Sequence, residues 1–267
     1  MKRNDAIAGL LLCHEPSAER ILERAGILAG AVDHLFIHYD GRAPEEVFTR
    51  LQAGAANLPR ITVLDTRIGV HWGGDDMVEA MLLLLGAAAG AGDFAYFAFL
   101  STSHYPLRDA ADARATLEAM LRGKSGLEAK PMPARQVLLR LVIPFDKTKR
   151  RSHLGPSGLM RNLATLVRLV ARHGRPHWGS QWMVISRADL PALGGLRNRL
   201  REGEFASWKI PDEVLLQTVL RSSREPYLST YFEFDPANTG SPRTLDPAAV
   251  SRLKAADTAH LFARKVP

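Results

Sequence analysis

The stretch Phe94-Ala-Tyr-Phe-Ala-Phe-Leu100 decides how the chain folds, and Ser101-Thr-Ser-His-Tyr-Pro-Leu-Arg108 follows it directly. The first segment is a short apolar run rich in aromatic residues, which is typical of a strand buried on both faces. The second segment is polar and is followed by a helical pattern from Asp109. Ligands of open α/β sheets bind at the carboxyl ends of central strands, so we expect a substrate at the 101–108 loop.

Strand and helix patterns alternate along the rest of the chain. Strands are predicted at residues 6–13, 35–39, 61–64, 182–185 and 231–234. Helices are predicted at 18–28, 44–53, 75–91, 110–121, 159–173, 190–201, 212–220 and 247–256, whereas 136–143 fits either state. This alternation predicts an α/β fold with a Rossmann-like, mostly parallel sheet flanked by helices. No linker-like segment divides the chain, so we expect a single domain.

The composition indicates which kinds of partner and which cellular location to expect. The 267 residues include 35 Lys and Arg against 28 Asp and Glu, a formal net charge of +7. This balance favours an anionic partner, although a solvated basic surface would look the same. No nucleic-acid-binding motif is present, so we expect no nucleic-acid partner. A single cysteine, no signal peptide and no bilayer-length apolar run indicate a cytoplasmic protein, with peripheral contact to the inner face of the membrane as an added expectation.

Motifs for common cofactors are missing from the sequence. The first predicted strand ends in Cys13-His-Glu-Pro16 instead of a glycine fingerprint, which argues against a dinucleotide cofactor. There is also no Walker loop, no G-x-S-x-G elbow and no H-E-x-x-H motif. The acidic pair Asp75-Asp76 fits a helix N-terminus better than a metal site. We therefore expect neither cofactor nor metal.

Several short motifs together resemble those of a known family. They are, in chain order, Leu12-Cys-His14, Phe36-Ile-His-Tyr-Asp40, Val70-His-Trp-Gly-Gly74, Leu100-Ser-Thr-Ser-His-Tyr-Pro-Leu-Arg108, Gly179-Ser-Gln-Trp182, Pro211-Asp-Glu213, Ser241-Pro-Arg243 and Phe262-Ala-Arg-Lys265. Each motif is weak alone, but their order, spacing and coverage make the chain similar to the core-2/I-branching enzymes (glycosyltransferase family 14). This family includes β-1,6-N-acetylglucosaminyltransferases and peptide xylosyltransferases.

The resemblance implies a GT-A-type fold that uses a nucleotide-sugar donor, inverts the anomeric centre and lacks the metal-binding D-x-D motif. It also implies one glycosyltransferase domain over residues 1–267, with a nucleotide-binding half at 1–125 and an acceptor and catalytic half at 126–267. We expect a compact, bacterial-type form without the membrane anchor, stem and disulfide cysteines of the animal relatives.

Glu213 matches the catalytic carboxylate that the resemblance implies. Inverting transfer needs a base that takes the proton from the acceptor hydroxyl as it attacks. Asp212 would then cap or orient the segment. Without the resemblance, Asp212 and Glu213 are equally explained as helix N-terminal acids that interact favourably with the helix dipole.

Arg243 and Lys265 match the family's replacement for a metal ion. Cationic side chains there would neutralise the diphosphate as it leaves. Arg264 is a third candidate, and because adjacent side chains of an extended segment point in opposite directions, we expect only one of Arg264 and Lys265 to reach the phosphates. A solvated basic terminus is the competing interpretation.

The remaining site residues are also implied by the resemblance. Those assigned to the nucleotide are Leu12, His14, Asp40, Arg67 and His71, although Arg67 would equally pair with Asp65 and either histidine would equally be structural. Those assigned to the donor sugar or the acceptor are Ser103, His104, Tyr105, Glu128, Gln181, Trp182, Asp212 and Tyr231. Trp182 would pack on a sugar face or fill the core. Ser103-His104 stand where many relatives carry Gln-Asp, which leaves the donor sugar open.

These observations predict a metal-independent, inverting glycosyltransferase. Its partners would be a UDP-sugar, with N-acetylglucosamine or xylose as the sugar, and a glycan or lipid-linked glycan acceptor. The alternative is a non-catalytic nucleotide- or glycan-binding protein on the same fold.

Overall fold

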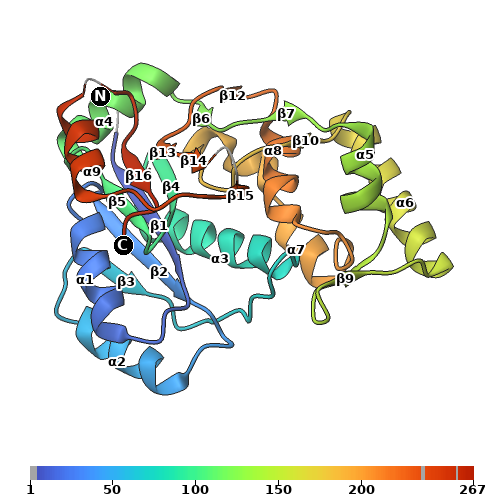
Figure 1. Cartoon of the computed structure of the whole chain (residues 1–267), viewed down its shortest axis with the longest axis horizontal. Helices are drawn as coiled ribbons and strands as arrows, with labels where there is room; N and C mark the ends of the chain where they lie inside the picture. Colours follow the sequence, from blue (N-terminus) through green and yellow to red (C-terminus); the bar gives the residue numbers. More distant parts are fainter. Residues whose placement is uncertain (1–4, 236–237, 257) are drawn as a thin grey trace.

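The computed structural model describes residues 5–235, 238–256 and 258–267. Its main sheet has seven strands and lies at the left of the molecule in Figure 1. Across the sheet they are β12 (Arg224–Glu225), β6 (Ser125–Gly126), β11 (Val184–Ser186), β4 (Tyr96–Ser101), β1 (Ile7–Cys13), β2 (His34–Tyr39) and β3 (Ile61–Val63). The mixed α/β fold expected from the sequence is confirmed.

The order of the strands reverses at β1. Strands β2 and β3 follow β1 on one side, whereas β4 pairs with β1 on the other side, and all four strands run parallel. β11 then pairs antiparallel with both β4 and β6. The crevice outside the carboxyl ends of β1 and β4 is therefore the topological switch point at which ligands of such sheets bind.

Helices cover both faces of the sheet, so its central strands are buried on both sides. In β1, Leu11 packs with α1 (Ala18–Leu28), α2 (Glu45–Ala55) and α4 (Ala110–Leu121). Its neighbour Leu10 packs with α3 (Asp76–Ala91) on the opposite face. β4 alternates in the same way, with Ala98 and Phe99 in the two different cores. This period-two division explains why the strands are continuous apolar runs in the sequence.

The ends of the helices follow local rules. Ser17 lies just before α1, and its hydroxyl accepts a hydrogen bond from the Arg20 amide, as a helix N-cap does. The predicted helix at 190–201 is instead split into the 3₁₀ helix η2 (Arg187–Leu193) and α7 (Leu196–Arg201). Gly194 and Gly195 interrupt it, and Gly195 has a φ of +78°, a conformation that glycine adopts without steric cost.

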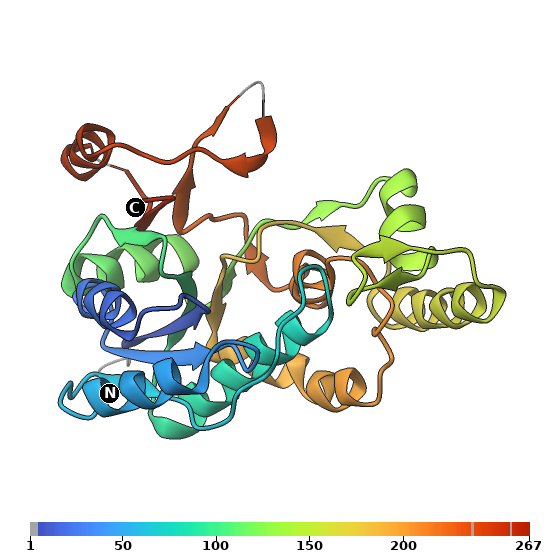
Figure 2. The ribbon, with the colours of Figure 1, turned by 60° about the horizontal axis from the view of Figure 1, so that its bottom comes forward.

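A second lobe is formed mainly by residues 130–175 and extends away from strands β1–β3 (Figure 2). Its elements are β7 (Lys130–Pro131), α5 (Ala134–Val137), the π-helical turn η1 (Leu138–Val142), β8 (Phe145–Asp146), β9 (Arg151–Ser152) and α6 (Pro156–His173). The ambiguous 136–143 segment is thus helical. The predicted start of α6 at residue 159 was too late, because Pro156 occupies the first helical turn, where proline is well tolerated.

The remaining elements connect and complete the two parts. They are β10 (His177–Trp178), the 3₁₀ turn η3 (Pro211–Glu213), α8 (Leu215–Leu220), β14 (Phe234–Asp235) and β15 (Asn238–Pro242). A small sheet of β13 (Thr230–Phe232), β16 (Phe262–Arg264) and β5 (His104–Pro106) packs with α9 (Pro247–Ala255). Through β16, this sheet brings the end of the chain next to the loop that follows β4.

No helix within the described ranges is both long enough and apolar enough to cross a bilayer.

Candidate active site

A cavity of about 1230 Å³ lies at the carboxyl ends of β1, β2 and β4. It is larger than the roughly 300–1,000 Å³ of a typical small-molecule site, so it has room for two substrates. Most predicted site residues line it: Leu12, His14, Asp40, Ser103, Glu128, Gln181, Trp182, Asp212, Glu213 and Arg264. The predicted residues that are not part of its wall are Arg67, His71, His104, Tyr105, Tyr231, Arg243 and Lys265.

Glu213 reaches the cavity from η3, the turn that precedes α8. The Glu213 side chain is 34% exposed, and its Oε2 atom lies 2.8 Å from Nη1 of Arg140 in η1. The preceding Ile210 has a φ of +55°, an uncommon and strained conformation for a β-branched residue. Its amide donates to the Gly73 carbonyl at 2.8 Å, which ties η3 to the loop before α3. The Ile210–Gly73 hydrogen bond therefore anchors the backbone before Glu213, and Arg140 pairs with its carboxylate.

Asp212 is buried beside Glu213 and behaves differently. Burial, and next the negative charge of Glu213, raise the pKa of the Asp212 carboxyl from 3.8 to about 7. Two adjacent carboxyl groups thus have separate environments, one buried and one open to the cavity and paired with Arg140. Such a division is typical of sites in which one carboxylate does chemistry and its neighbour supports the structure.

The raised pKa of Asp212 predicts a pH-dependent stability. Between pH 3.8 and about 7 the folded protein holds a proton on Asp212 that the unfolded chain has lost, so this group's contribution to stability falls as the pH rises through that window. We expect Asp212→Asn to abolish this loss, and the thermal midpoint of the variant should exceed that of the parent more at about pH 8 than at about pH 5. A constant difference at both pH values would contradict the assignment.

Arg264, Trp182 and His104 form one stacked group on the β4 side of the cavity. The Arg264 guanidinium lies 4.8 Å from the Trp182 ring centroid, and its Nε donates to Ser103 Oγ at 3.0 Å. His104 packs edge-on against Trp182 from behind, with 4.8 Å between ring centroids. Burial and the nearby charge of Arg264 hold the pKa of His104 well below its usual range. His104 is thus buried and supports Trp182 in this structure, and its predicted contact with substrate stays a prediction.

The other two predicted cations lie beside the wall. Arg243 is 53% exposed and forms an ion pair with Glu233 at 2.5 Å. Lys265 donates from Nζ to Ser241 Oγ at 2.6 Å, and Ser241 itself lines the cavity. Arg264, which has no ion pair with a described carboxylate, is the member of the C-terminal group that faces the cavity.

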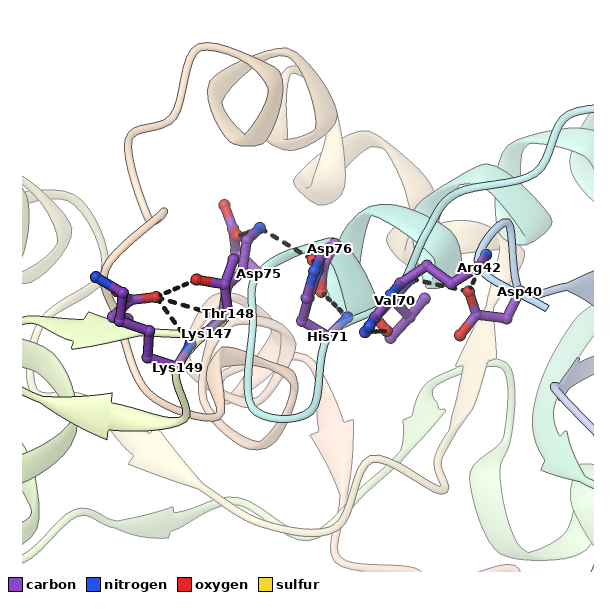
Figure 3. Close-up of polar contacts among 10 residues, drawn as sticks. Asp40, Arg42, Val70, His71, Asp75, Asp76, Lys147, Thr148 and Lys149 are labelled. Atoms are coloured by element: carbon purple, nitrogen blue, oxygen red, sulfur yellow. Dashed lines mark hydrogen bonds and ion pairs between the residues drawn. The ribbon is translucent and has the colours of Figure 1, made fainter.

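Asp40 faces the cavity at the end of β2 (Figure 3). Its Oδ1 accepts hydrogen bonds from the backbone amides of Arg42 at 2.8 Å and Val70 at 3.1 Å. No side chain or amide of the described chain bonds to Oδ2, which leaves that oxygen as an acceptor for a ligand. The geometry suits a hydroxyl or amide of a nucleoside.

Arg67 supports this loop from outside the cavity. It forms an ion pair with Glu45 and donates to the Asp40 carbonyl at 2.8 Å. Its guanidinium also lies 4.6 Å from the Phe48 ring centroid. The suggested pairing with Asp65 is wrong, since Asp65 instead accepts from Gln52. Arg67 therefore positions Asp40 from outside the cavity wall, and its predicted contact with the nucleotide stays a prediction.

His71 and the Asp75-Asp76 pair form an ionic cluster at the start of α3, shown in Figure 3. His71 Nδ1 lies 2.8 Å from Asp76 Oδ2. Lys147 Nζ lies 2.6 Å from Asp75 Oδ1 and 3.0 Å from Asp76 Oδ2. One ammonium group, that of Lys147, thus contacts both carboxylates of this acidic pair. In the parts of the chain that the structure describes, no group of three or more His, Cys, Asp or Glu is placed to hold a metal ion.

Aromatic side chains line the far side of the cavity. Trp178 and Phe232 are part of the wall, next to Glu128 and Gln181. Tyr231, predicted to face the acceptor, instead packs against His260 with 5.6 Å between ring centroids, because adjacent residues of β13 point to opposite faces. Tyr105 likewise lies beside Lys254 in the core under α9. Phe232 and Trp178 thus line the cavity in this structure, whereas Tyr231 and Tyr105 do not, and the predicted contacts of these two tyrosines with substrate stay predictions.

Several wall residues were missed from the sequence. Trp178 directly precedes a motif that was recognised, so its proximity to Gly179 was a usable signal. No sequence signal pointed to Arg140, because its partner Glu213 lies 73 residues away in the chain. Trp72, which is 55% exposed and lines the cavity, is adjacent to the predicted His71.

The profile of the Core-2/I-branching enzyme family matches residues 19–230, which is most of the chain. The chain belongs to this family. Family membership confirms the resemblance carried by the motifs and identifies the protein as a glycosyltransferase. No curated protein sequence gives a significant match.

Solved structures similar to this Core-2/I-branching enzyme are glycosyltransferases of low sequence identity. The WbbM bifunctional glycosyltransferase in its apo form is 10% identical, with a TM-score of 0.47, over 98% of this chain and 46% of that one. The chain thus spans about half the length of WbbM. The galactosyltransferase LgtC, in complex with donor and acceptor sugar analogs, is 11% identical, with a TM-score of 0.44, over 96% of this chain and 86% of that one. An active-site mutant of LgtC is 13% identical, with a TM-score of 0.46 and the same coverage.

Proposed function

We propose that this Core-2/I-branching enzyme is an inverting, metal-independent transferase that moves a sugar from a UDP-sugar to a hydroxyl of a glycan or lipid-linked glycan. One observation carries the proposal: a carboxylate, Glu213, and a cation without a carboxylate partner among the described residues, Arg264, line the same cavity at the switch point of the sheet. N-acetylglucosamine and xylose are the first candidates for the sugar.

Glu213 is the proposed base. The acceptor oxygen attacks the anomeric carbon from the face opposite the diphosphate, and a new carbon–oxygen bond forms while the bond to the β-phosphate oxygen breaks. The acceptor proton passes to the Glu213 carboxylate, and the electron pair of the broken bond leaves with UDP. Because Arg140 engages Oε2, the other oxygen of Glu213 is the one oriented to take the proton.

Arg264 is the proposed stabiliser of the leaving diphosphate. Negative charge grows on the β-phosphate as the bond breaks, and a fixed cation in a partly buried site stabilises it more strongly than water does. Lys265, which donates to the wall residue Ser241, and Arg243, the neighbour of the wall residue Pro242, would support this charge as the family resemblance implies. Asp40 would accept a hydrogen bond from the nucleoside at the opposite end of the cavity.

Metal independence is supported by the ionic cluster at α3. A divalent ion would need carboxylate ligands near the phosphates, and Asp75 and Asp76 are occupied by the ammonium group of Lys147 and by His71. The Lys147 ammonium group thus occupies the position at which the two carboxylates could otherwise bind a divalent metal ion.

A panel of nucleotide sugars, with and without EDTA, tests the proposal. We expect one UDP-sugar to raise the thermal midpoint and to be turned over at the same rate in both conditions, since bound ligand stabilises the folded state. ADP- and GDP-sugars are the matched controls. Turnover that disappears with EDTA and returns with Mn²⁺ would overturn metal independence, and stabilisation by GDP-sugars alone would overturn the choice of donor.

A further inference from the structure

Helix α6 exposes apolar side chains where a surface helix normally exposes polar ones. Met160, Leu163, Val167 and Val170 recur at spacings of three and four residues and therefore form one stripe along the helix. Met160 is 66% exposed and Val167 is 59% exposed. We call these four residues the α6 stripe. Their exposure needs an explanation, because contiguous apolar surface usually marks a contact site.

The opposite side of the same helix is unusually polar for a buried face. Asn162 is completely buried and donates from Nδ2 to the carbonyls of Val142 and Ser207, both at 3.3 Å. Thr165 is also buried, and its hydroxyl donates to the Glu204 carbonyl. Specific hydrogen bonds thus fix which side of α6 faces the protein. Because these hydrogen bonds fix the rotation of α6 about its axis, the α6 stripe faces outward.

Further exposed apolar residues lie on the segments next to α6. Leu154, in the loop before the helix, is 75% exposed, and Leu138 in η1 is 50% exposed. Figures 1 and 2 both show α5 and α6 at the end of the molecule farthest from β1–β3. A flat partner could therefore reach this end without meeting the main sheet.

The lobe that carries the α6 stripe is strongly basic. Residues 130–175 contain eleven Lys and Arg residues and one acidic residue, Asp146, a formal charge of +10, whereas the whole chain carries +7. The rest of the chain is therefore at −3, so the basic character of the protein resides in this lobe. Arg161 and Arg168 lie on the side of α6 that faces the protein, where Arg161 donates to Ser207 Oγ and Arg168 forms an ion pair with Glu204. Arg151 and Arg172 of the same lobe are exposed.

We infer that this lobe docks on the surface of an anionic lipid bilayer, with the α6 stripe inserted among the acyl chains and the exposed cations of the lobe, such as Arg151 and Arg172, at the level of the headgroups. An apolar helix face carried on a strongly basic surface is the pattern that binds such interfaces. Charge complementarity selects this occupant, because the cations attract anionic lipid and the like charges of two lobes would repel each other. Neither feature alone would suffice.

Docking in this way would bring the cavity close to the membrane. Turn η1 carries both the exposed Leu138 and Arg140 of the cavity wall, and Arg150 of the same lobe also lines the cavity. If the proposed transfer takes place, an acceptor carried on a lipid would lie on the membrane side of the enzyme. The docking itself does not depend on that activity, since a vesicle binds or fails to bind without any donor.

Vesicle co-sedimentation of the whole chain tests the inference. We expect binding to vesicles of equal parts phosphatidylcholine and phosphatidylglycerol, little binding to phosphatidylcholine alone, and weaker binding as salt is raised. Leu163→Ser with Val167→Ser should lower the partition coefficient at least roughly tenfold, and Arg151→Gln with Arg172→Gln should lower it by a similar factor. All four side chains are exposed, so the thermal midpoint should not change.

Matched variants elsewhere on the surface separate docking from general effects. Met120→Ser on α4, where Met120 is 42% exposed, and Arg60→Gln with Arg252→Gln should leave vesicle binding unchanged. No sedimentation with anionic vesicles would overturn the inference. Vesicle binding that the Leu163→Ser and Val167→Ser changes do not weaken would also overturn the inference. It would indicate a purely electrostatic contact, as with a soluble polyanion. A dimer in light scattering that these two changes dissociate, without vesicle binding, would make the stripe an interface between copies of the chain.

Discussion

Replacing Glu213 by glutamine is expected to lower the turnover number by roughly 10²–10⁴-fold, the usual contribution of a general base, while UDP affinity stays within about twofold. Glutamine keeps the size of the side chain and a hydrogen bond to Arg140 but cannot accept the acceptor proton. The measurement is steady-state transfer together with UDP binding by calorimetry. A non-catalytic binding protein would show no turnover in the parent, so the comparison also separates that alternative.

Glu128→Gln is the matched control for Glu213→Gln. Glu128 lines the same cavity and pairs with Lys130 at 2.5 Å, so the same chemical change is made in the same site. As an acceptor-binding residue it should raise the acceptor KM and leave the turnover number at saturating acceptor nearly unchanged. If Glu128→Gln abolishes turnover and Glu213→Gln does not, the base has been assigned to the wrong carboxylate.

The sheet and its flanking helices could be predicted because local signals and tertiary demands agree there. Strands buried on both faces are apolar runs, as in β4 (Tyr96–Ser101), which was predicted at 94–100, and the Ser17 cap marks the start of α1. The secondary structure could not be predicted where the local sequence favours no single state. The π-helical turn η1 has an apolar sequence that fits strand and helix equally, and it takes its form from packing on α6.

Differences between the predicted site residues and the cavity wall follow from the geometry of strands. A motif locates a strand end within a residue or so, but neighbouring side chains on a strand point to opposite faces. In β13, Phe232 lines the wall and the predicted Tyr231 does not. At the end of β16, Arg264 lines the wall and Lys265 does not, which is the alternation from which only one of these two cations was expected at the phosphates. The contact between Arg140 and Glu213 could not be predicted from local sequence, since only the folded chain brings the two residues together.

Arg264 differs from the other C-terminal cations in what surrounds it. Its charge faces the neutral partners Trp182 and Ser103, and burial lowers its pKa to about 10, so it remains cationic at neutral pH. Arg243, by contrast, is neutralised by Glu233. A half-buried cation without a carboxylate partner in the described chain destabilises the folded protein until an anion binds. That arrangement is typical of a binding site and not of a structural ion pair.

We therefore expect Arg264→Gln to lower kcat/KM by roughly 10²–10³-fold and to weaken UDP binding, because one donor to the developing charge is lost. Arg264→Lys should recover part of the activity, since it keeps the charge but not the planar fork. The thermal midpoint of Arg264→Gln without ligand should stay equal to or rise above that of the parent, as a desolvated charge has been removed. Arg243→Gln and Lys265→Gln, which change cations outside the wall, should each cost less. If either of them costs more than Arg264→Gln, the diphosphate lies nearer to Ser241 and Arg264 only supports Trp182.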